Sequence, residues 1–437
     1  MTTFEIAHRL LSEYEASGKY VNLSLNSHLT DSLTKEERAT LTALLYGAVE
    51  RKMRYDYYIA ALSGRGIDKI TPRVRDILRI GMCALIDMDK IPDHAAVNEC
   101  VKLARNSGER SFVNGILRRV ARERDSLPLP DKNKNAARYY SIYYSLPLST
   151  VKYFISLLGE ESAVEFFKST FERSKKTALT VNTLKISVSD FIEKLKALGY
   201  DAERSDFSDI SVIVHSSVNP KAVEGFASGE FFVQDEASAI AASALGLLPR
   251  ELCVDVCAAP GGKSFALAIL AENNARVCSF DLHESKISLI SGGAERLSLA
   301  SVKAEARDAL EPDESLFGMV DRVLCDVPCS GLGVIGKKPD LRYKDIASLA
   351  SLPALQAEIL KASSKYLKAG GTLVYSTCTL MRAENEGVIE AFLSENPDFE
   401  RVDFSCGKAV SFGGCLTLYP HIHGTDGFFI AKLRKNK

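Results

Sequence analysis

Apolar residues recur at helical spacing through the first part of the chain. Phe4, Ala7, Leu11 and Tyr14 mark one face of an amphipathic helix. The same spacing continues in KEERATLTALLYGAVERKMRYDYYIAALS, PRVRDILRIGMCALIDMD, DHAAVNECVKLAR and SFVNGILRRVARER, and Pro, Gly and Asp separate these segments. The pattern predicts an all-α bundle over residues 1–126.

Two different patterns follow the predicted bundle. The stretch DSLPLPDKNKNAARYY is rich in proline and polar residues, which predicts a linker over residues 127–144. Residues 145–235 then mix the helical segments STVKYFISLLG and VSDFIEKLKALG with the short strand-like segments ALTVNTL, SVIVHS and GEFFVQ. This mixture predicts a small α+β module.

From residue 236 to residue 437, apolar runs alternate with helical segments. The runs LCVDVC, ARVCSFD, DRVLCDV and GTLVYST are typical of buried strands, and KSFALAILAE, SKISLISGGAERL, LPALQAEILKASSKYLK and ENEGVIEAFLSEN are helical. Such alternation predicts a doubly wound α/β domain with a parallel sheet, in which ligands bind beyond the carboxyl ends of the strands. The unusual residues of this sequence lie at those ends.

Composition limits the class of protein. A chain of 437 residues with 46% apolar and 25% charged residues predicts two or three globular domains. We expect no transmembrane helix, because no run of 18 apolar residues occurs, and no secretory signal at the amino terminus. Ten cysteines without a CxxC pair or zinc spacing argue against a structural metal and favour a reducing cytoplasm. We expect a monomer.

The segment DVCAAPGGKS, from Asp255 to Ser264, is the first candidate ligand loop. Its two glycines allow close approach of the backbone to a ligand, and the following helix start favours a negative group. A Walker A loop is disfavoured because Cys257 takes the place of its first glycine, and the dinucleotide fingerprint is missing. A cofactor with a carboxylate and no pyrophosphate, such as S-adenosylmethionine, and a plain turn between strand and helix both remain open.

Acidic residues follow the next two predicted strands. Asp281 ends CSFD, 18 residues after Lys263, where a carboxylate grips a ribose diol in related folds. The alternative is that Asp281 caps the next helix. Asp308, in AEARDAL, follows the third strand and could accept a hydrogen bond from an adenine amino group.

Two cysteines end the fourth and fifth predicted strands. Cys329 follows Asp326 in DVPCSGLG, and Cys378 lies in YSTCT. A lone cysteine is usually structural, but two beside a cofactor cleft suggest an activated thiolate. Addition of a thiolate to C6 of cytosine makes C5 able to attack a sulfonium methyl group, and an acid near N3 stabilises the charge. A second thiol could help to expel the first, and spacing alone does not assign the roles.

Together these motifs resemble the RNA cytosine-C5 methyltransferases of the Sun/RsmB type, which act on small-subunit ribosomal RNA. The resemblance rests on CAAPGGK, DVPCSGLG, KPDLR, YSTCT with ENE, and DGFFIAKL. LLYGAVERKMRYD, HAAVNECVKLAR and SFVNGILRR are similar to the NusB-like RNA-binding domain of that group. The resemblance therefore implies a NusB-like bundle, a small α+β module and a Rossmann-like class I methyltransferase domain that uses S-adenosylmethionine.

The resemblance also implies roles for single residues. Cys378 would be the nucleophile, Cys329 would aid product release, and Asp326 would be the acid at the base and a cofactor contact. Asp281 would bind the ribose and Asp308 the adenine side of S-adenosylmethionine. The loop that would bind its methionine part consists of Cys257, Ala258, Ala259, Pro260, Gly261, Gly262 and Lys263. Lys263 would also contact the substrate or Asp326.

RNA contacts are predicted on the bundle and on the module. The basic tract comprises Lys102, Arg105, Arg110, Arg118, Arg119, Arg122 and Arg124. This tract could hold the RNA backbone, or it could be an ordinary solvated helix face. The net charge of the whole chain is only −1, so any RNA-binding surface must be a local patch of positive charge. Asn182 belongs to the Arg-x-Asn signature of the family, but Thr180 replaces its arginine. The target cytosine must leave its stack to be attacked.

Three other functions stay open at this point. A non-catalytic RNA-binding protein with a vestigial methyltransferase fold is the main alternative from another class, although the glycine loop, the acids and both thiols are present. The same chemistry on transfer RNA is a closer one. A dehydrogenase is disfavoured by the missing dinucleotide fingerprint.

Overall fold

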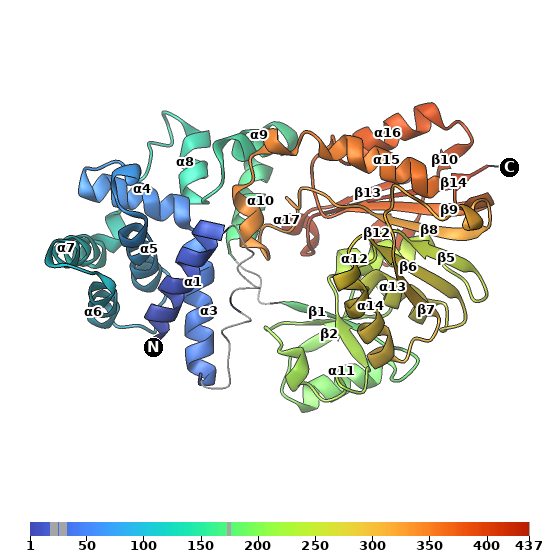
Figure 1. Cartoon of the computed structure of the whole chain (residues 1–437), viewed down its shortest axis with the longest axis horizontal. Coiled ribbons are helices and arrows are strands. Elements are labelled where there is room, and N and C mark those ends of the chain that lie inside the picture. Colours follow the sequence, from blue (N-terminus) through green and yellow to red (C-terminus); the bar gives the residue numbers. More distant parts are fainter. Residues whose placement is uncertain (18–24, 26–32, 173–175, 437) are drawn as a thin grey trace. The chain divides into compact units, whose positions relative to one another are not determined.

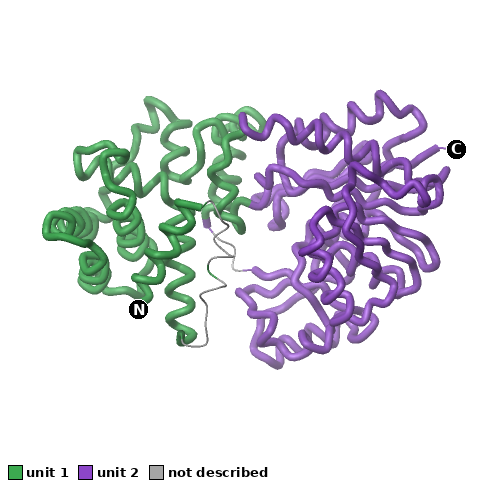
Figure 2. The backbone as a smooth tube through the Cα atoms, viewed as in Figure 1, with its two compact units in different colours: residues 1–171, 335–346 green, residues 172–334, 347–437 purple. Residues whose placement is uncertain are grey.

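The computed structural model describes residues 1–17, 25, 33–172 and 176–436 (Figure 1). The chain divides into two compact units, which Figure 2 shows in green and purple. Unit 1 contains residues 1–171 and 335–346, and unit 2 contains residues 172–334 and 347–437. The chain therefore returns to unit 1 for one short segment between two parts of unit 2.

Unit 1 is helical, as its sequence pattern predicts. Local signals fix several helix starts: Thr34 and Glu37 form a capping box before α3, Pro72 begins α5, and the Asn106 side chain caps α7. The helices are α1 (Thr3–Ser17), α3 (Lys35–Glu50), α4 (Lys52–Ser63), α5 (Pro72–Ile86), α6 (Asp93–Leu103), α7 (Ser107–Glu123), α8 (Ala136–Tyr143), α9 (Leu148–Leu158) and α10 (Glu160–Phe171).

Helix α5 lies at the centre of the unit 1 core. It packs against α1, α3, α6 and α7, and Ile77 and Leu78 are fully buried. Its buried Arg79 donates to both carboxylate oxygens of Asp56 at 2.8 and 2.7 Å, so the charge is paired inside the core.

The two units divide the chain differently from the segments predicted from sequence. Helix α8 lies within the predicted linker, and α9 and α10 lie in unit 1 although the α+β module was expected to begin at residue 145. Their apolar side chains explain this, because Phe154 and Phe167 pack in an aromatic cluster with Tyr140 and Tyr144 of the α8 region.

The segment 335–346 carries the KPDLR motif and is anchored in unit 1. Arg342 is 1% exposed and donates to the carbonyl oxygens of Tyr144 at 2.7 Å and Thr170 at 3.1 Å. The hydroxyl of Tyr343 lies 2.7 Å from a carbonyl oxygen of α3. An invariably charged guanidinium can satisfy several carbonyls at once, which explains its complete burial.

Unit 2 begins with a small antiparallel sheet and one helix. The strand order is β2-β3-β1-β4, and Phe191 and Leu195 of α11 bury their side chains with the apolar face of this sheet. Its elements are β1 (Thr177–Val181), α11 (Val188–Ala197), β2 (Ala202–Arg204), β3 (Ser211–Val214) and β4 (Phe231–Val233).

The rest of unit 2 is built on a large twisted sheet with the order β10-β14-β9-β8-β5-β6-β7. Strands β5 to β9 are parallel, as predicted, whereas β14 runs antiparallel beside β9 and pairs with β10 and β13. The strands of this sheet are β5 (Leu252–Asp255), β6 (Arg276–Asp281), β7 (Val302–Ala306), β8 (Val320–Asp326), β9 (Leu367–Thr377), β10 (Phe399–Arg401), β13 (Cys415–Leu418) and β14 (Phe428–Lys435). Two short strands, β11 (Ser405–Cys406) and β12 (Ala409–Val410), form a separate antiparallel pair.

Helices cover both faces of this sheet (Figure 1). One core contains apolar residues of α12, α13 and α14, and the other contains those of α15 and α16. The helices are α12 (Glu236–Leu245), α13 (Gly262–Leu270), α14 (Glu284–Leu297), α15 (Leu352–Ser364), α16 (Glu386–Glu395) and α17 (Pro420–His423). The chain leaves β5 for β6 on one side and returns as β8 on the other. This switch point places a cleft at the carboxyl ends of β5 and β8.

None of the helices among the described residues combines the length and the apolar character that a membrane crossing requires.

Candidate active site

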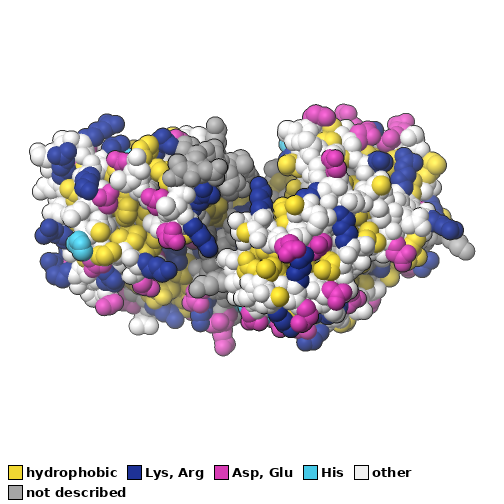
Figure 3. Space-filling model, turned by 90° about the horizontal axis from the view of Figure 1, so that it is seen from below, with side chains coloured by type: hydrophobic (Ala, Val, Ile, Leu, Met, Phe, Trp, Pro, Cys, Tyr) yellow, Lys and Arg dark blue, Asp and Glu magenta, His cyan; other side chains and the backbone are white. Residues whose placement is uncertain are grey.

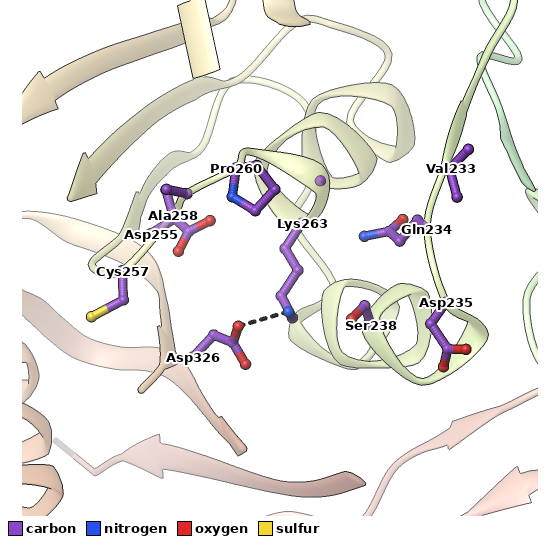
Figure 4. A pocket seen from close by; sticks show the side chains of 12 residues that line it. Val233, Gln234, Asp235, Ser238, Asp255, Cys257, Ala258, Pro260, Lys263 and Asp326 are labelled. Carbon is purple, nitrogen blue, oxygen red and sulfur yellow. Dashed lines mark hydrogen bonds and ion pairs between the residues drawn. The ribbon is translucent and has the colours of Figure 1, made fainter. Parts of the chain in front are cut away.

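A glycine turn forms one wall of the cleft. Strand β5 ends at Asp255, and Gly261 has a φ of +108°, which favours glycine. A Cβ atom at Gly261 would also overlap the ring of Phe265. The turn leads directly into α13, whose first two residues, Gly262 and Lys263, line the cleft, and the first N–H groups of a helix have no partner within it. The residues that line the cleft are Val233, Gln234, Asp235, Ser238, Asp255, Cys257, Ala258, Ala259, Pro260, Gly262, Lys263 and Asp326 (Figure 4).

Asp281 holds the glycine turn from the end of the neighbouring strand. Its carboxylate accepts the N–H of Ala259 at 3.2 Å and the N–H of His283 at 3.2 Å. The N–H of Arg307 donates to the carbonyl oxygen of Asp281 at 2.9 Å and joins the ends of β6 and β7. Asp308 follows immediately and is half-buried. The two acids thus lie after neighbouring strands, as the sequence predicted.

Lys263 and Asp326 form an ion pair at the bottom of the cleft. The amine of Lys263, on the first turn of α13, lies 2.7 Å from Oδ2 of Asp326, and Figure 4 draws this bond. Oδ1 of Asp326 accepts from the hydroxyl of Ser376 at 2.7 Å. Burial lowers the pKa of Lys263, but the charge and hydrogen bond of Asp326 outweigh burial, and the net pKa is raised. The amine therefore stays protonated.

Asp255 is another carboxyl group at the cleft, and the sequence analysis did not single it out. The hydroxyl of Ser264 donates to its Oδ2 at 2.6 Å, and the hydroxyl of Ser279 lies 2.8 Å from that of Ser264. Burial raises the pKa of Asp255 to about 7. Its position at the end of the strand before the glycine turn was the available sequence signal.

The two thiols meet at the ends of β8 and β9. The Sγ atoms of Cys329 and Cys378 are 2.9 Å apart, and both residues are half-buried. The hydrogen bond to Cys378, burial and nearby negative charges raise the pKa of Cys329 well above its ordinary value. Cys329 therefore keeps its proton, and the two sulfur atoms lie within hydrogen-bond distance of each other. Cys329 follows β8, which ends at Asp326, and Cys378 follows the neighbouring strand β9. The structure therefore places all three residues at one edge of the sheet, as predicted.

The small module contributes Gln234 to the cleft, a residue that sequence reasoning missed. The hydroxyl of Thr180 donates to its Oε1 at 3.0 Å and orients the amide, which points toward the cleft in Figure 4. Asn182 is fully buried and donates to the carbonyl oxygens of Gly229 at 3.0 Å and Leu297 at 2.9 Å. Asn182 thus joins the module to α14, and it is not among the residues that we propose to contact RNA.

The basic tract of unit 1 lies on α6 and α7, on the connection between them and on the residue that follows α7. Lys102 pairs with Glu99 at 2.5 Å and Arg119 pairs with Glu123 at 2.9 Å, so acidic neighbours partly balance the tract. Arg118 and Arg105 are exposed as well. Figure 3 shows basic and acidic side chains interspersed over one face of the protein. Any RNA surface here is a local one.

The described part of the chain holds no cluster of three or more His, Cys, Asp or Glu side chains that could bind a metal ion. The cysteines at the cleft lie beside a lysine and single carboxylates instead.

The fold and the cleft are those of an α/β methyltransferase. A solved structure named as a methyltransferase homolog protein from Pyrococcus horikoshii is 28% identical with a TM-score of 0.61, covering 69% of this chain and 99% of that one. The crystal structure of PH0851 is 25% identical with a TM-score of 0.83, covering 100% of this chain and 99% of that one.

The sequence comparisons identify the family. Residues 242–434 match a family described as 16S rRNA methyltransferase RsmB/F, and residues 1–122 match the NusB family. A Bacillus subtilis (strain 168) relative named "Probable ribosomal RNA small subunit methyltransferase B" is 37% identical over 99% of this chain and 98% of its own. Ribosomal RNA small subunit methyltransferase B of Proteus mirabilis (strain HI4320) is 30% identical, covering 94% of each chain. The chain belongs to the RsmB family of ribosomal RNA small subunit methyltransferases, which confirms the resemblance.

Proposed function

We propose that this protein transfers a methyl group from S-adenosylmethionine to C5 of a cytosine in 16S ribosomal RNA. The observation that carries the proposal is the pair of thiols 2.9 Å apart, beside the Lys263–Asp326 ion pair at the switch point of the sheet. The family and the names of its members supply the class of substrate.

The residues of the cleft fit S-adenosylmethionine. The N–H groups at the start of α13 suit a carboxylate, and the positive φ of Gly261 and its packing against Phe265 hold the turn that leads into this helix. Asp281 and Asp308, after the next two strands, would bind the ribose and the adenine side. When bound there, the cofactor supplies an electrophilic methyl group on a sulfonium.

Cys378 is the nucleophile in this proposal. Its sulfur forms a bond to C6 of the flipped cytosine, and the electrons of the C5–C6 double bond shift toward the N3 side of the ring. Asp326, which is ion-paired with the protonated Lys263 and accepts from Ser376, would meet that side and pass a proton from Lys263 to it. C5 then carries the electron density needed to accept the methyl group.

Cys329 acts when the product is released. A base must take the proton from C5, the electrons of that C–H bond form the C5–C6 double bond again, and the bond between C6 and the sulfur of Cys378 breaks with its electron pair going to the sulfur. Cys329 lies 2.9 Å from that sulfur and keeps its own proton in the free protein, so its thiol is placed to protonate the departing sulfur.

The RNA would contact unit 1 through exposed residues of the basic tract, among them Lys102, Arg105, Arg118 and Arg119. A monomer that works in the cytoplasm stays a prediction from the sequence.

Methyl transfer to C5 of 16S ribosomal RNA in vitro tests the proposal. We expect Cys378→Ser to abolish transfer with unchanged affinity for S-adenosylmethionine, and Cys329→Ala to accumulate a protein–RNA adduct that survives a denaturing gel. Active Cys378→Ser protein would refute the assigned nucleophile. No transfer by the wild type and no adduct with Cys329→Ala would favour an RNA-binding protein without this activity.

A further inference from the structure

Glu384 is a buried carboxyl group for which the proposed chemistry has no role. It is 1% exposed and lies in the turn between β9 and α16, within the ENE sequence. A buried carboxylate is costly unless its oxygens are bonded, and among the described residues Oε2 of Glu384 finds hydrogen-bond partners whereas Oε1 finds none. The partners of Oε2 show what Glu384 organises.

The carboxylate of Glu384 holds the residues on both sides of Cys329. Its Oε2 accepts the backbone N–H of Ser330 at 2.9 Å and the amide of Gln356 at 2.8 Å. The same Gln356 amide donates to the carbonyl oxygen of Pro328 at 2.9 Å. One carboxylate oxygen therefore fixes the turn immediately before and after the thiol.

Asn385, the residue next to Glu384, holds the residues on both sides of Cys378. The Oδ1 of Asn385 accepts from the hydroxyl of Thr377 at 2.6 Å, and its amide donates to the carbonyl oxygen of Thr379 at 3.0 Å. These two threonines flank Cys378 in the chain. The hydroxyls of Thr379 and Ser330 are 2.6 Å apart and join the two cysteine turns directly.

We propose that Glu384 is a positioning residue that fixes the Cys329 thiol against the sulfur of Cys378, with Asn385 holding the Cys378 side. This inference rests on the proposed roles of the two thiols. Without Glu384, the Ser330 N–H and one Gln356 bond lose their acceptor, and the Cys329 turn is free to move away. Distances of a few tenths of an ångström matter for proton transfer between sulfur atoms.

Glu384 also acts on Cys329 through its negative charge. It is one of the negative groups that raise the pKa of Cys329, after the hydrogen bond to Cys378, burial and the charge interaction with Cys378. Glu384 thus helps to keep the proton on Cys329, where product release needs it. Glu384→Gln keeps an oxygen acceptor for Ser330 and removes the charge, whereas Glu384→Ala removes both.

Thiol cross-linking without RNA tests the positioning directly. Diamide, an azo oxidant, takes two electrons and two protons from Cys329 and Cys378 and becomes a hydrazine, leaving a disulfide that peptide mass spectrometry detects. We expect Glu384→Ala to slow this cross-link about tenfold or more, because the turn no longer holds the sulfur atoms together. The cross-linking rate of Glu384→Gln should stay within about threefold of the wild-type rate. Glu390 is an exposed acid on α16, and the cross-linking rate of Glu390→Ala should equal that of the wild type. Wild-type cross-linking in Glu384→Ala would overturn the proposal.

Turnover experiments separate positioning from folding. Glu384→Ala should accumulate the same covalent RNA adduct as Cys329→Ala with unchanged S-adenosylmethionine affinity, and Glu384→Gln should largely restore release. If Glu384→Ala does not fold, Gln356→Ala removes the bridge to Pro328 and should slow cross-linking about threefold or more. Wild-type behaviour of Gln356→Ala would then overturn the proposal. Slowed cross-linking together with active Cys378→Ser would support positioning and refute the nucleophile assignment alone.

Discussion

Gly333 and Gly427 lie backbone against backbone beside the thiols. The N–H of Gly427 donates to the carbonyl oxygen of Gly333 at 2.9 Å, and the N–H of Gly333 donates to that of Cys378 at 3.0 Å. A Cβ atom on Gly333 would overlap the carbonyl oxygen of Gly427. The two glycines therefore allow the turn after Cys329 to dock on the end of β9.

Gly333→Ala should separate the two thiols. The clash is with backbone, which cannot rotate away, so the Cys329 turn must shift. We expect methyl transfer to fall at least about tenfold and the free energy of unfolding to fall by about 1–3 kcal/mol. Gly292→Ala is the matched control, because its Cβ would meet nothing within 4 Å on α14, and it should be neutral or stabilising. Normal activity of Gly333→Ala would show that this contact does not hold the site.

Asp281→Ala should weaken cofactor binding before it affects the thiols. The substitution removes the acceptor of the Ala259 N–H and the carboxylate proposed for the ribose. We expect the Kd for S-adenosylmethionine, measured by calorimetry, to rise at least about tenfold, which corresponds to about 1.4 kcal/mol. Glu284→Ala, an exposed acid in the first turn of α14, should leave the Kd unchanged. An unchanged Kd in Asp281→Ala would remove this residue from the cofactor site.

The strand ends explain how much of the site could be predicted. In a parallel sheet, the carboxyl ends of neighbouring strands meet at one edge, so a residue after β8 and one after β9 must come close. This reasoning predicted that Asp326, Cys329 and Cys378 lie at one edge of the sheet, and the structure places them there. The residues that fix them were not, because Glu384 and Asn385 act through a turn whose contacts have no periodic signature.

Burial of polar residues was the other feature that the sequence did not indicate. Asn182 and Thr180 lie in a strand-like segment, and nothing local shows that their side chains are used inside the protein. The same holds for Arg342, because a charged residue after proline in a loop normally lies in solvent. The burial of these side chains depends on carbonyl oxygens that lie far away in the sequence, so no short stretch of sequence around each residue reveals it.

Asp255→Asn should change how stability depends on pH. The pKa of Asp255 rises on folding from an ordinary value of 3.8 to about 7, so between these values the folded protein holds a proton that the unfolded chain releases. The free energy of unfolding therefore falls as pH rises through this window and is level above it. Because asparagine does not titrate, the variant should gain stability relative to wild type between pH 4 and pH 7, by up to about 4 kcal/mol.

Urea unfolding at pH 5 and pH 8 measures this difference. The neighbouring Lys263 and Asp326 are present in both proteins, and their interaction with Asp255 is part of the measured difference. Glu400→Gln, at an exposed position on β10, should show no such change with pH. A constant difference between Asp255→Asn and wild type at the two pH values would show that Asp255 titrates normally.

Arg118→Ala should lower the salt dependence of RNA binding. If Arg118 contacts a phosphate, its loss removes one released counterion, and the slope of log K against log salt should decrease by about 0.7–0.9. Filter binding to 16S ribosomal RNA at several salt concentrations measures the slope. Lys361→Ala is the control, because this exposed lysine on α15 lies outside unit 1 and pairs with Glu395. Equal slopes for all three proteins would favour an ordinary solvated helix face.

Arg342→Met should destabilise unit 1. The guanidinium satisfies carbonyl oxygens of Tyr144 and Thr170 in a position that is 1% exposed, and methionine fills similar space but donates nothing. Buried acceptors without donors cost about 1–3 kcal/mol each, so we expect a loss of about 3–5 kcal/mol in the free energy of unfolding. Arg342→Lys should recover only part, because one ammonium cannot reproduce the planar fork.

Hydrogen exchange shows where the loss of Arg342 acts. Amides of residues 335–346 and of α10 should exchange faster in Arg342→Met, whereas those of β5 and β6 should not change, because these strands belong to unit 2. Lys338→Ala, four residues earlier and exposed, is the control for a general effect on the segment. Faster exchange throughout unit 2 would mean that Arg342 stabilises the whole protein rather than the anchoring of one segment. Wild-type stability of Arg342→Met would mean that the segment is held by Tyr343 and its apolar neighbours instead.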